Sequence, residues 1–282
     1  MKQRIITGIF IIAVTLPIVL LSDYIVYPIA IGLCSLMAMF EILRVLGLEK
    51  RWSVSLPTYI ISALMPVFAY DLFLGEGAVY AENYILLCMC IIFTYLLYIM
   101  GASVFSKGKL SVTSAATVFM MLTYVVSSFT ALSLIRYIEG GEVIFVLVFI
   151  VAWISDVGAY FVGSLLGKHK LIPEVSPKKT VEGAIGGIVI AILAFLLYGW
   201  GVELFTDYEA NYAVLAISGG ILAVISQVGD LIASLLKREH EIKDYSNILP
   251  GHGGIMDRFD SIIAVSTPLL AIAFIAAPFV IV

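Results

Sequence analysis

Residues 183–204 read GAIGGIVIAILAFLLYGWGVEL, an apolar run in which Glu203 is the only charged side chain. A helix needs about 20 mostly apolar residues to cross a bilayer, so this stretch predicts a membrane-spanning helix. The rest of the chain is similar, because 62% of its 282 residues are hydrophobic and only 13% are charged. Soluble domains have about 25% charged residues. This composition excludes a soluble globular enzyme, a disordered chain, a disulfide-rich secreted module and a nucleic-acid binder with a basic face.

Other apolar segments extend this pattern along the whole chain. The predicted spans lie at about 5–21, 24–46, 54–72, 83–103, 112–135, 143–167, 183–204, 212–236 and 260–282. Cytoplasmic loops of membrane proteins carry an excess of Lys and Arg. A cytoplasmic N-terminus places every basic residue except Arg136 on the cytoplasmic side. We therefore expect an all-α polytopic membrane protein with nine transmembrane helices, a cytoplasmic N-terminus and an external C-terminus.

The two halves of the chain differ in their buried polar residues. Residues 1–140 have one acid well within a span, Glu41, which we expect to pair with Arg44 on the same helix face. Residues 141–282 have two loops rich in Lys, Gly and Pro, and three acids in spans: Asp156, Asp230 and Asp260. An ionisable group in a membrane costs at least about 2.5–3.5 kcal/mol, so such groups tend to line functional cavities. The sequence predicts a transmembrane scaffold over 1–140 and a catalytic region over 141–282.

The last cytoplasmic loop and its flanking helices place acids and cations at one depth. On the preceding helix, Asp230, Lys237 and Arg238 share one stripe, and Asp230 lies about 10 Å below Lys237. Asp257 and Asp260 share a face where the last helix begins. Mg²⁺ takes oxygen ligands, usually one or two carboxylates plus substrate phosphates. We therefore predict a Mg²⁺–polyphosphate site in which Asp230, Asp257 and Asp260 bind the metal.

Basic, hydroxyl and glycine residues beside these acids are suited to bind phosphate. Lys and Arg neutralise phosphate charge, and glycines let backbone N–H groups approach an anion. The predicted catalytic cations are Lys179, Lys237, Arg238, Lys243 and Arg258. The predicted phosphate-binding hydrogen-bonders are Ser176, Thr180, His252, Gly253 and Gly254. Ser176 as N-cap and Pro177 as first helical residue predict that a helix begins there, with its N-terminus toward the cytoplasm.

Simpler interpretations of these features stay open. Lys and Arg at cytoplasmic helix ends are also topology signals. The glycine pairs at 163/167 and 183/187 have the small-residue spacing typical of helix packing. Asp156, a further candidate metal ligand, lies about 18 Å along a helix from Lys168. It would reach the site only if that helix breaks near its glycines or if the cavity is deep.

The segment from Ser234 to Asp260 resembles the signature of the phosphatidate cytidylyltransferases, also called CDP-diacylglycerol synthases. The segment from Asp156 to Gly183 is similar to the same family, whereas the first half resembles it only in being multi-spanning. The matching polar residues of the first-named segment are Ser234, Lys237, Arg238, Lys243, Asp244, Ser246, His252, Gly253, Gly254, Asp257, Arg258 and Asp260.

This resemblance implies a homodimeric enzyme of the bacterial cell membrane, with its active site facing the cytoplasm. The enzyme would use CTP and phosphatidate to make CDP-diacylglycerol and pyrophosphate for phospholipid synthesis. The resemblance also implies Mg²⁺, with a monovalent cation such as K⁺ nearby, and it assigns Asp230, Asp257 and Asp260 to the metal.

The implied reaction is compatible with the residues present. A phosphomonoester is mostly dianionic at neutral pH, so its attack on the α-phosphorus of CTP requires no general base. The chain has only three histidines and no Ser-His-Asp arrangement. Two alternatives stay open: a CTP-dependent kinase of a polyprenol-type lipid, and a secondary transporter with ion sites at Asp156 and Asp230. Transporters typically have repeat halves and midplane acids, and no repeat is evident here.

Overall fold

The computed structural model describes residues 13, 17–74, 78–251 and 253–281. They form two compact units: unit 1, Met1–Tyr137 with Asp244–Met256, and unit 2, Ile138–Lys243 with Asp257–Val282. Eight helices of the described part are long and apolar enough to cross a membrane, so the chain is an integral membrane protein. The predicted span at 5–21 falls largely outside the described residues. Unit 1 ends near the predicted boundary at 140 and also includes a segment of the last loop.

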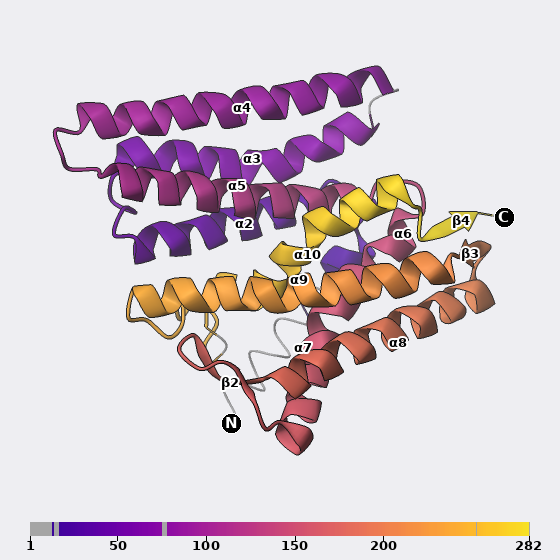
Figure 1. The fold of residues 1–282 in the computed structure, drawn as a ribbon. Coiled ribbons are helices and arrows are strands. Elements are labelled where there is room, and N and C mark those ends of the chain that lie inside the picture. Colours follow the sequence, from indigo (N-terminus) through magenta and orange to yellow (C-terminus); the bar gives the residue numbers. More distant parts are fainter. Residues whose placement is uncertain (1–12, 14–16, 75–77, 252, 282) are drawn as a thin grey trace. The chain divides into compact units, whose positions relative to one another are not determined.

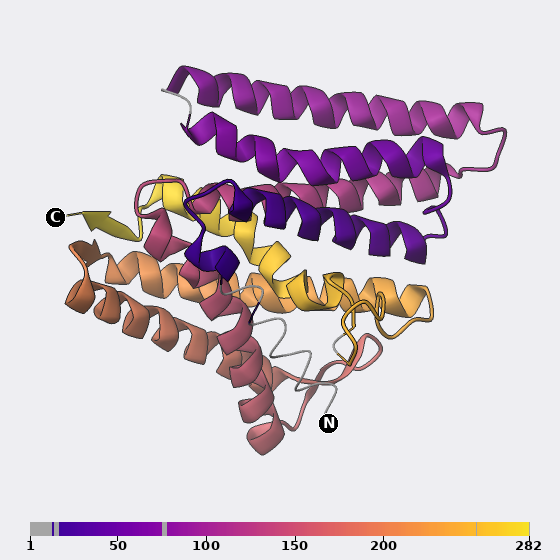
Figure 2. The ribbon, with the colours of Figure 1, turned by 180° about the vertical axis from the view of Figure 1, so that it is seen from behind.

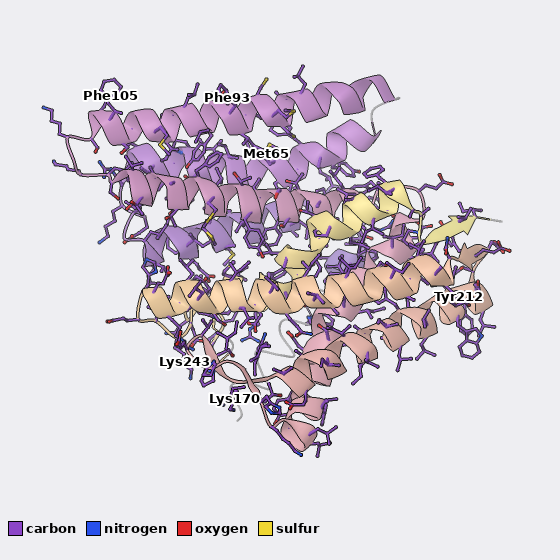
Figure 3. All side chains as sticks on the ribbon, in the orientation of Figure 1. Met65, Phe93, Phe105, Lys170, Tyr212 and Lys243 are labelled. Carbon is purple, nitrogen blue, oxygen red and sulfur yellow. The ribbon has the colours of Figure 1, made fainter. Side chains whose placement is uncertain are left out.

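The described part of unit 1 contains four long helices that run alongside one another (Figure 1). They are α2 (Val26–Val45), α3 (Trp52–Leu74), α4 (Ala78–Phe105) and α5 (Val112–Ile135). Each lies within a few residues of a predicted span. Buried Tyr27 of α2 donates from its hydroxyl to Leu132 O of α5 at 3.1 Å. Helix α4 carries large exposed apolar side chains, including Phe93 and Phe105 (Figure 3), which suits a surface covered by lipid.

Charged residues of unit 1 gather at the two ends of its helices. Arg51 Nη1 donates to Lys109 O at 2.5 Å, which joins the α2–α3 loop to the α4–α5 loop at one end. After α5, Arg136 forms an ion pair with Asp23 at 2.5 Å, just before α2. The loops that carry Arg51 and Lys109 thus lie at the opposite end of the helices from Asp23, as the alternation of predicted spans requires. Which end faces the cytoplasm stays a prediction.

Unit 2 combines membrane helices with two short antiparallel sheets. Its elements are α6 (Gly141–Ile144), α7 (Val146–Leu166), β1 (Lys170–Ile172), β2 (Ser176–Thr180), α8 (Val181–Phe205), β3 (Tyr208–Ala210), α9 (Tyr212–Glu239), α10 (Met256–Ile275) and β4 (Phe279–Ile281). Strand β1 pairs with β2, and β3 pairs with β4. Helices α8 and α9 lie side by side in both views of the ribbon (Figures 1 and 2).

The last helix differs from the predicted span at 260–282. Helix α10 begins earlier, at Met256, and ends at Ile275. Pro278 follows, and the residue before a proline is disfavoured in helical conformation. The chain then forms β4, in which Phe279 pairs with Ala210 of β3. The apolar tail of the sequence is therefore a strand rather than the end of a membrane helix.

The start of α8 also differs from the prediction. Ser176 and Pro177 lie in β2, and the helix begins at Val181. Thr180 has extended backbone angles, and its hydroxyl accepts a hydrogen bond from Gly183 N at 3.2 Å, so Thr180 is the N-cap. The prediction was wrong because pairing with β1 keeps the polar segment extended.

Helices α7 and α8 approach each other closely at glycine positions. A Cβ at Gly187 would lie 2.6 Å from Ser155 O and 3.1 Å from Ala159 Cβ. A Cβ at Gly163 would lie 2.8 Å from Thr180 Oγ1. Real Cβ atoms essentially never come within 3.0 Å of another heavy atom, so glycine at these positions lets the helices pack as they do. The packing interpretation of the small-residue spacing therefore holds at these contacts.

Gly187→Ala is expected to destabilise the protein by about 1–3 kcal/mol, because the added methyl group overpacks the α7–α8 contact. Gly201→Ala on the same helix is the matched control, since a Cβ there meets nothing within 4 Å. That substitution should be neutral or slightly stabilising. Thermal unfolding of both variants in detergent measures the difference. Equal melting temperatures for the two variants would contradict the close approach of α7 and α8.

Candidate active site

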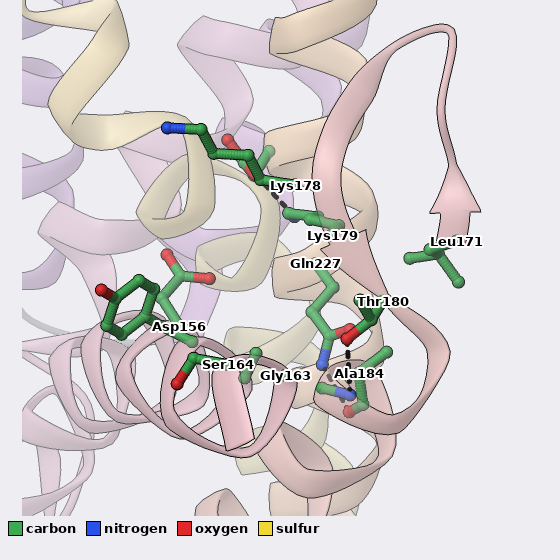
Figure 4. A pocket seen from close by; sticks show the side chains of 13 residues that line it. Asp156, Gly163, Ser164, Leu171, Lys178, Lys179, Thr180, Ala184 and Gln227 are labelled. Atoms are coloured by element: carbon green, nitrogen blue, oxygen red, sulfur yellow. Dashed lines mark hydrogen bonds and ion pairs between the residues drawn. The ribbon is translucent and has the colours of Figure 1, made fainter. Parts of the chain in front are cut away.

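A cavity of about 300 Å³ lies within unit 2 (Figure 4). Its walls come from α7, the β1–β2 hairpin, α8 and α9. The polar or charged lining residues are Asp156, Tyr160, Ser164, Lys178, Lys179, Thr180, Gln227 and Asp230. Gln227 Nε2 donates to Ala184 O at 3.1 Å, which holds α9 against the first turn of α8. The cavity therefore brings together predicted site residues from α7, the β1–β2 hairpin and α9.

An ion pair crosses this cavity from the hairpin to α9. Lys179 Nζ of β2 lies 2.6 Å from Asp230 Oδ2. Both side chains are about a quarter exposed, at 23% and 27%. Both residues line the cavity, so the pair contributes a cation and a carboxylate to its wall. The structure thus joins a predicted phosphate-binding cation directly to a predicted metal ligand.

A second ion pair joins α9 to α10 and is more deeply buried. Lys237 Nζ lies 2.7 Å from Asp257 Oδ1, and the side chains are 11% and 3% exposed. Lys237 follows Asp230 on the same stripe of α9, as the sequence predicted. The charges of the pair balance each other, which is the condition for keeping ionised groups out of water.

Three acids of unit 2 interact electrostatically with one another: Asp156, Asp230 and Asp260. They come from α7, α9 and α10. Asp156 also interacts electrostatically with Lys179. Helix α7 is continuous from Val146 to Leu166, and Asp156 lines the cavity from within this unbroken helix.

The carboxylates of unit 2 have the donor chemistry of a Mg²⁺ site. Within the described residues, no three His, Cys, Asp or Glu side chains already form a cluster that could hold a metal ion. Instead, Asp230 and Asp257 each hold a lysine ammonium group. Both carboxylates are thus already paired with a positively charged group, and their hard oxygen atoms suit Mg²⁺. The residues therefore fit a divalent cation that would compete with lysine for these acids.

The other predicted cations of unit 2 lie near the hairpin end of α9. Arg238 Nε donates to Val175 O at 3.5 Å, which links the end of α9 to the β1–β2 connection. Lys243 and Arg258 are exposed. Lys243 lies at the same end of unit 2 as Lys170, whereas Tyr212 lies at the opposite end (Figure 3). Phosphate binding by these residues stays a prediction.

The glycine loop before α10 belongs to unit 1 and is tightly organised there. Gly253 N donates to Leu249 O at 3.0 Å, and Gly253 has a positive φ of 85°. A Cβ at Gly254 would lie 2.6 Å from Glu41 Cδ. His252, a predicted phosphate-binding residue, lies outside the described residues. The loop therefore already surrounds one anionic group, the Glu41 carboxylate.

The expected Glu41–Arg44 pair was wrong. The Glu41 carboxylate is fully buried and accepts hydrogen bonds from Ser246 Oγ at 2.5 Å, Ile255 N at 2.9 Å and Met256 N at 2.8 Å. These donors satisfy the carboxylate better than one cation on the same helix could, because buried charge needs several hydrogen bonds. Its position as a lone acid within a span drew attention to Glu41 in the sequence, but the sequence does not reveal which residues it contacts.

Residues 2–276 match the model of the cytidylyltransferase family. The chain belongs to the cytidylyltransferase family. Phosphatidate cytidylyltransferase of Bacillus subtilis (strain 168) is 36% identical over 270 residues, which cover 94% of each chain. The enzyme of the same name from Staphylococcus saprophyticus subsp. saprophyticus is 36% identical over 275 residues, covering 98% of this chain and 99% of that one. That of Staphylococcus epidermidis (strain ATCC 35984) is 34% identical over the same length.

Membership in the cytidylyltransferase family makes the protein a nucleotidyltransferase. The match also extends through the first half of the chain, where the motifs alone resembled the family only in spanning the membrane. The cavity of unit 2 suits this class of cytidylyltransferase, because its acids and lysines can balance the charge of a polyphosphate. No observation favours the kinase or the transporter.

Proposed function

We propose that the protein transfers the cytidylyl group of CTP to phosphatidate and thereby forms CDP-diacylglycerol and pyrophosphate. The observation that carries the proposal is the Lys179–Asp230 ion pair, which lines a cavity together with Asp156. It supports the proposal because it brings a cation and two carboxylates together at the wall of one cavity. Family membership and the names of the relatives support CTP and phosphatidate as the substrates.

The reaction forms one bond and breaks another at the α-phosphorus of CTP. A phosphatidate oxygen, already deprotonated, attacks this phosphorus, and the bond to the bridging oxygen of the pyrophosphate breaks. No proton has to be removed from the nucleophile. Lys179 and Lys237 supply positive charge that reduces the repulsion between the two anions, and Arg238, Lys243 and Arg258 are further phosphate-binding candidates.

We propose that Asp230, Asp257 and Asp260 hold Mg²⁺, with Asp156 as a further candidate and a monovalent cation such as K⁺ nearby. When bound, a divalent cation polarises a phosphoryl oxygen and neutralises charge on the leaving pyrophosphate. The lysines have a complementary task. Once Asp230 has another partner, the Lys179 ammonium group is available to a phosphate. Ser176, Thr180, His252, Gly253 and Gly254 stay candidate hydrogen-bonders to phosphate.

We also propose where the enzyme works. The basic loops set the proposed orientation: a cytoplasmic N-terminus, an external C-terminus and a cytoplasmic site. The membrane is the bacterial cell membrane, and the working form is a homodimer. Phosphatidate keeps its acyl chains in the bilayer, so the site must be open to lipid as well as to soluble CTP.

Purified protein in detergent with phosphatidate and CTP labelled at either the α- or the γ-phosphate tests the reaction. We expect α-label in the lipid, release of pyrophosphate, complete loss of turnover in EDTA and recovery with excess Mg²⁺. Transfer of the γ-label to a lipid alcohol would instead show a kinase. Turnover that is unchanged in EDTA would contradict the role proposed for the metal.

A further inference from the structure

Glu41 is an acid of α2 whose partners all lie in the segment that leads into α10. Its Oε1 accepts from Ser246 Oγ and Ile255 N, and its Oε2 accepts from Met256 N. All three partners donate, which is the pattern that an ionised carboxylate requires. The contacts lie wholly within unit 1 and span up to 215 positions of sequence. They are therefore long-range tertiary contacts and not part of a local turn.

Two of these bonds satisfy the start of α10. The first N–H groups of a helix have no partner inside the helix, and a negative charge there is favourable. Helix α10 begins at Met256, so Ile255 N and Met256 N are such donors. Most helices obtain this bond from a nearby Ser, Thr, Asp or Asn. Here the carboxylate comes from a different membrane helix.

Gly254 leaves the space that the carboxylate occupies. A Cβ there would meet Glu41 Oε2 at 2.5 Å and Cδ at 2.6 Å. Gly251 and Gly253 have positive φ angles, whereas Gly254 does not, so backbone conformation alone does not require glycine at Gly254. The requirement for glycine comes from Glu41.

We propose that Glu41 is a positioning residue that fixes the start of α10 and thereby the acids of its first turn, Asp257 and Asp260. This inference rests on the proposed function, in which Asp257 and Asp260 bind Mg²⁺. The physical link is short: Met256, held by the carboxylate, is bonded directly to Asp257, and the helix carries Asp260 one turn along. Groups that orient metal ligands typically change metal affinity or activity by 10–100-fold when they are mutated.

Glu41→Gln tests the contact itself. The amide keeps one acceptor oxygen, but its NH₂ group takes the place of the other oxygen and faces a hydrogen-bond donor. At least one of the two backbone N–H groups therefore loses its acceptor. We expect amide hydrogen exchange at Ile255 or Met256 to become at least tenfold faster. We also expect the Mg²⁺ concentration for half-maximal turnover to rise about 10–100-fold. The exchange measurement needs no turnover, so it stands even if the proposed reaction is wrong.

A double-mutant cycle with Gly254→Ala separates this role from a direct contact between Gly254 and phosphate. Gly254→Ala alone should reproduce the Mg²⁺ shift of Glu41→Gln, because the methyl group displaces the carboxylate. In a Glu41→Ala background the space is open, so Gly254→Ala should add less than a twofold further loss. A full additional loss in that background would contradict the proposal and would indicate that Gly254 itself contacts substrate.

Tyr95→Phe is the control for a purely structural role. Its hydroxyl shares a buried 2.6 Å hydrogen bond with Thr58 in unit 1, far along the sequence from the loop before α10. The Tyr95→Phe substitution should lower the melting temperature without changing the Mg²⁺ requirement. If Glu41→Gln behaves in the same way, lowering stability while leaving both the Mg²⁺ requirement and the exchange at residues 255–256 unchanged, then Glu41 does not position α10.

Discussion

Asp230→Asn is expected to lower turnover about a thousandfold or more while leaving the melting temperature unchanged or raised. The loss follows because a metal contributes several kcal/mol to the transition state and each 1.36 kcal/mol is a factor of ten. Stability is retained because Asp230 lies near Asp156 and Asp260, so neutralising it relieves repulsion between carboxylates. Lys179 keeps its interaction with Asp156. Functional sites often hold such repulsion at a cost in stability.

Glu239→Gln is the matched control, because Glu239 is an exposed acid on the same helix, α9. That variant should keep both its turnover and its melting temperature. Turnover with labelled CTP and thermal unfolding in detergent give the two readouts. Asp230→Asn with more than a tenth of wild-type turnover at ordinary Mg²⁺ would remove Asp230 from the metal site.

Asp257→Asn is expected to inactivate the enzyme and also to destabilise it by about 3–5 kcal/mol. The substitution leaves the Lys237 ammonium group buried without its carboxylate, and removing one member of a buried pair has about this cost. This double effect distinguishes Asp257 from the more exposed Asp230. Denaturant or thermal unfolding, beside the turnover assay, measures both parts.

Adding Lys237→Met to Asp257→Asn separates the two effects. The double variant should regain most of the lost stability, since a buried ion pair can be replaced by neutral groups at little cost. It should stay inactive, because the carboxylate is still missing. Wild-type stability of Asp257→Asn alone would contradict the stabilising role of the buried ion pair. Turnover by the double variant would contradict the catalytic role of Asp257.

Most of the described membrane helices could be predicted from sequence, because a bilayer demands long apolar runs whatever the tertiary structure. The two small antiparallel sheets could not. Strand β4 is as apolar as a helix end, and hydropathy does not reveal its pairing with β3. Likewise, Ser176 and Pro177 have the pattern of a helix start, yet pairing with β1 holds them in a strand. Short strands depend on partners that hydropathy does not reveal.

Sequence spacing indicated several of the residues that line the cavity but not the contacts between them. The stripe of α9 follows from helical periodicity, and α9 does carry Asp230 and Lys237 on one side. That Lys179 pairs with Asp230 depends on how the hairpin folds over the cavity. Glu41 was missed for a related reason: Ser246 lies 205 positions away, beyond any local pattern. Spacing identifies the chemistry of a helix face, whereas partners across the fold need coordinates.

The central claim is that the acids of unit 2 bind a divalent cation together with CTP. Mn²⁺ titration of the purified protein with a non-reactive CTP analogue, followed by electron paramagnetic resonance, tests it most directly. We expect tight Mn²⁺ binding in the wild type and in Glu239→Gln, and its loss in Asp230→Asn and Asp260→Asn. Undiminished tight binding in both aspartate variants would contradict the account.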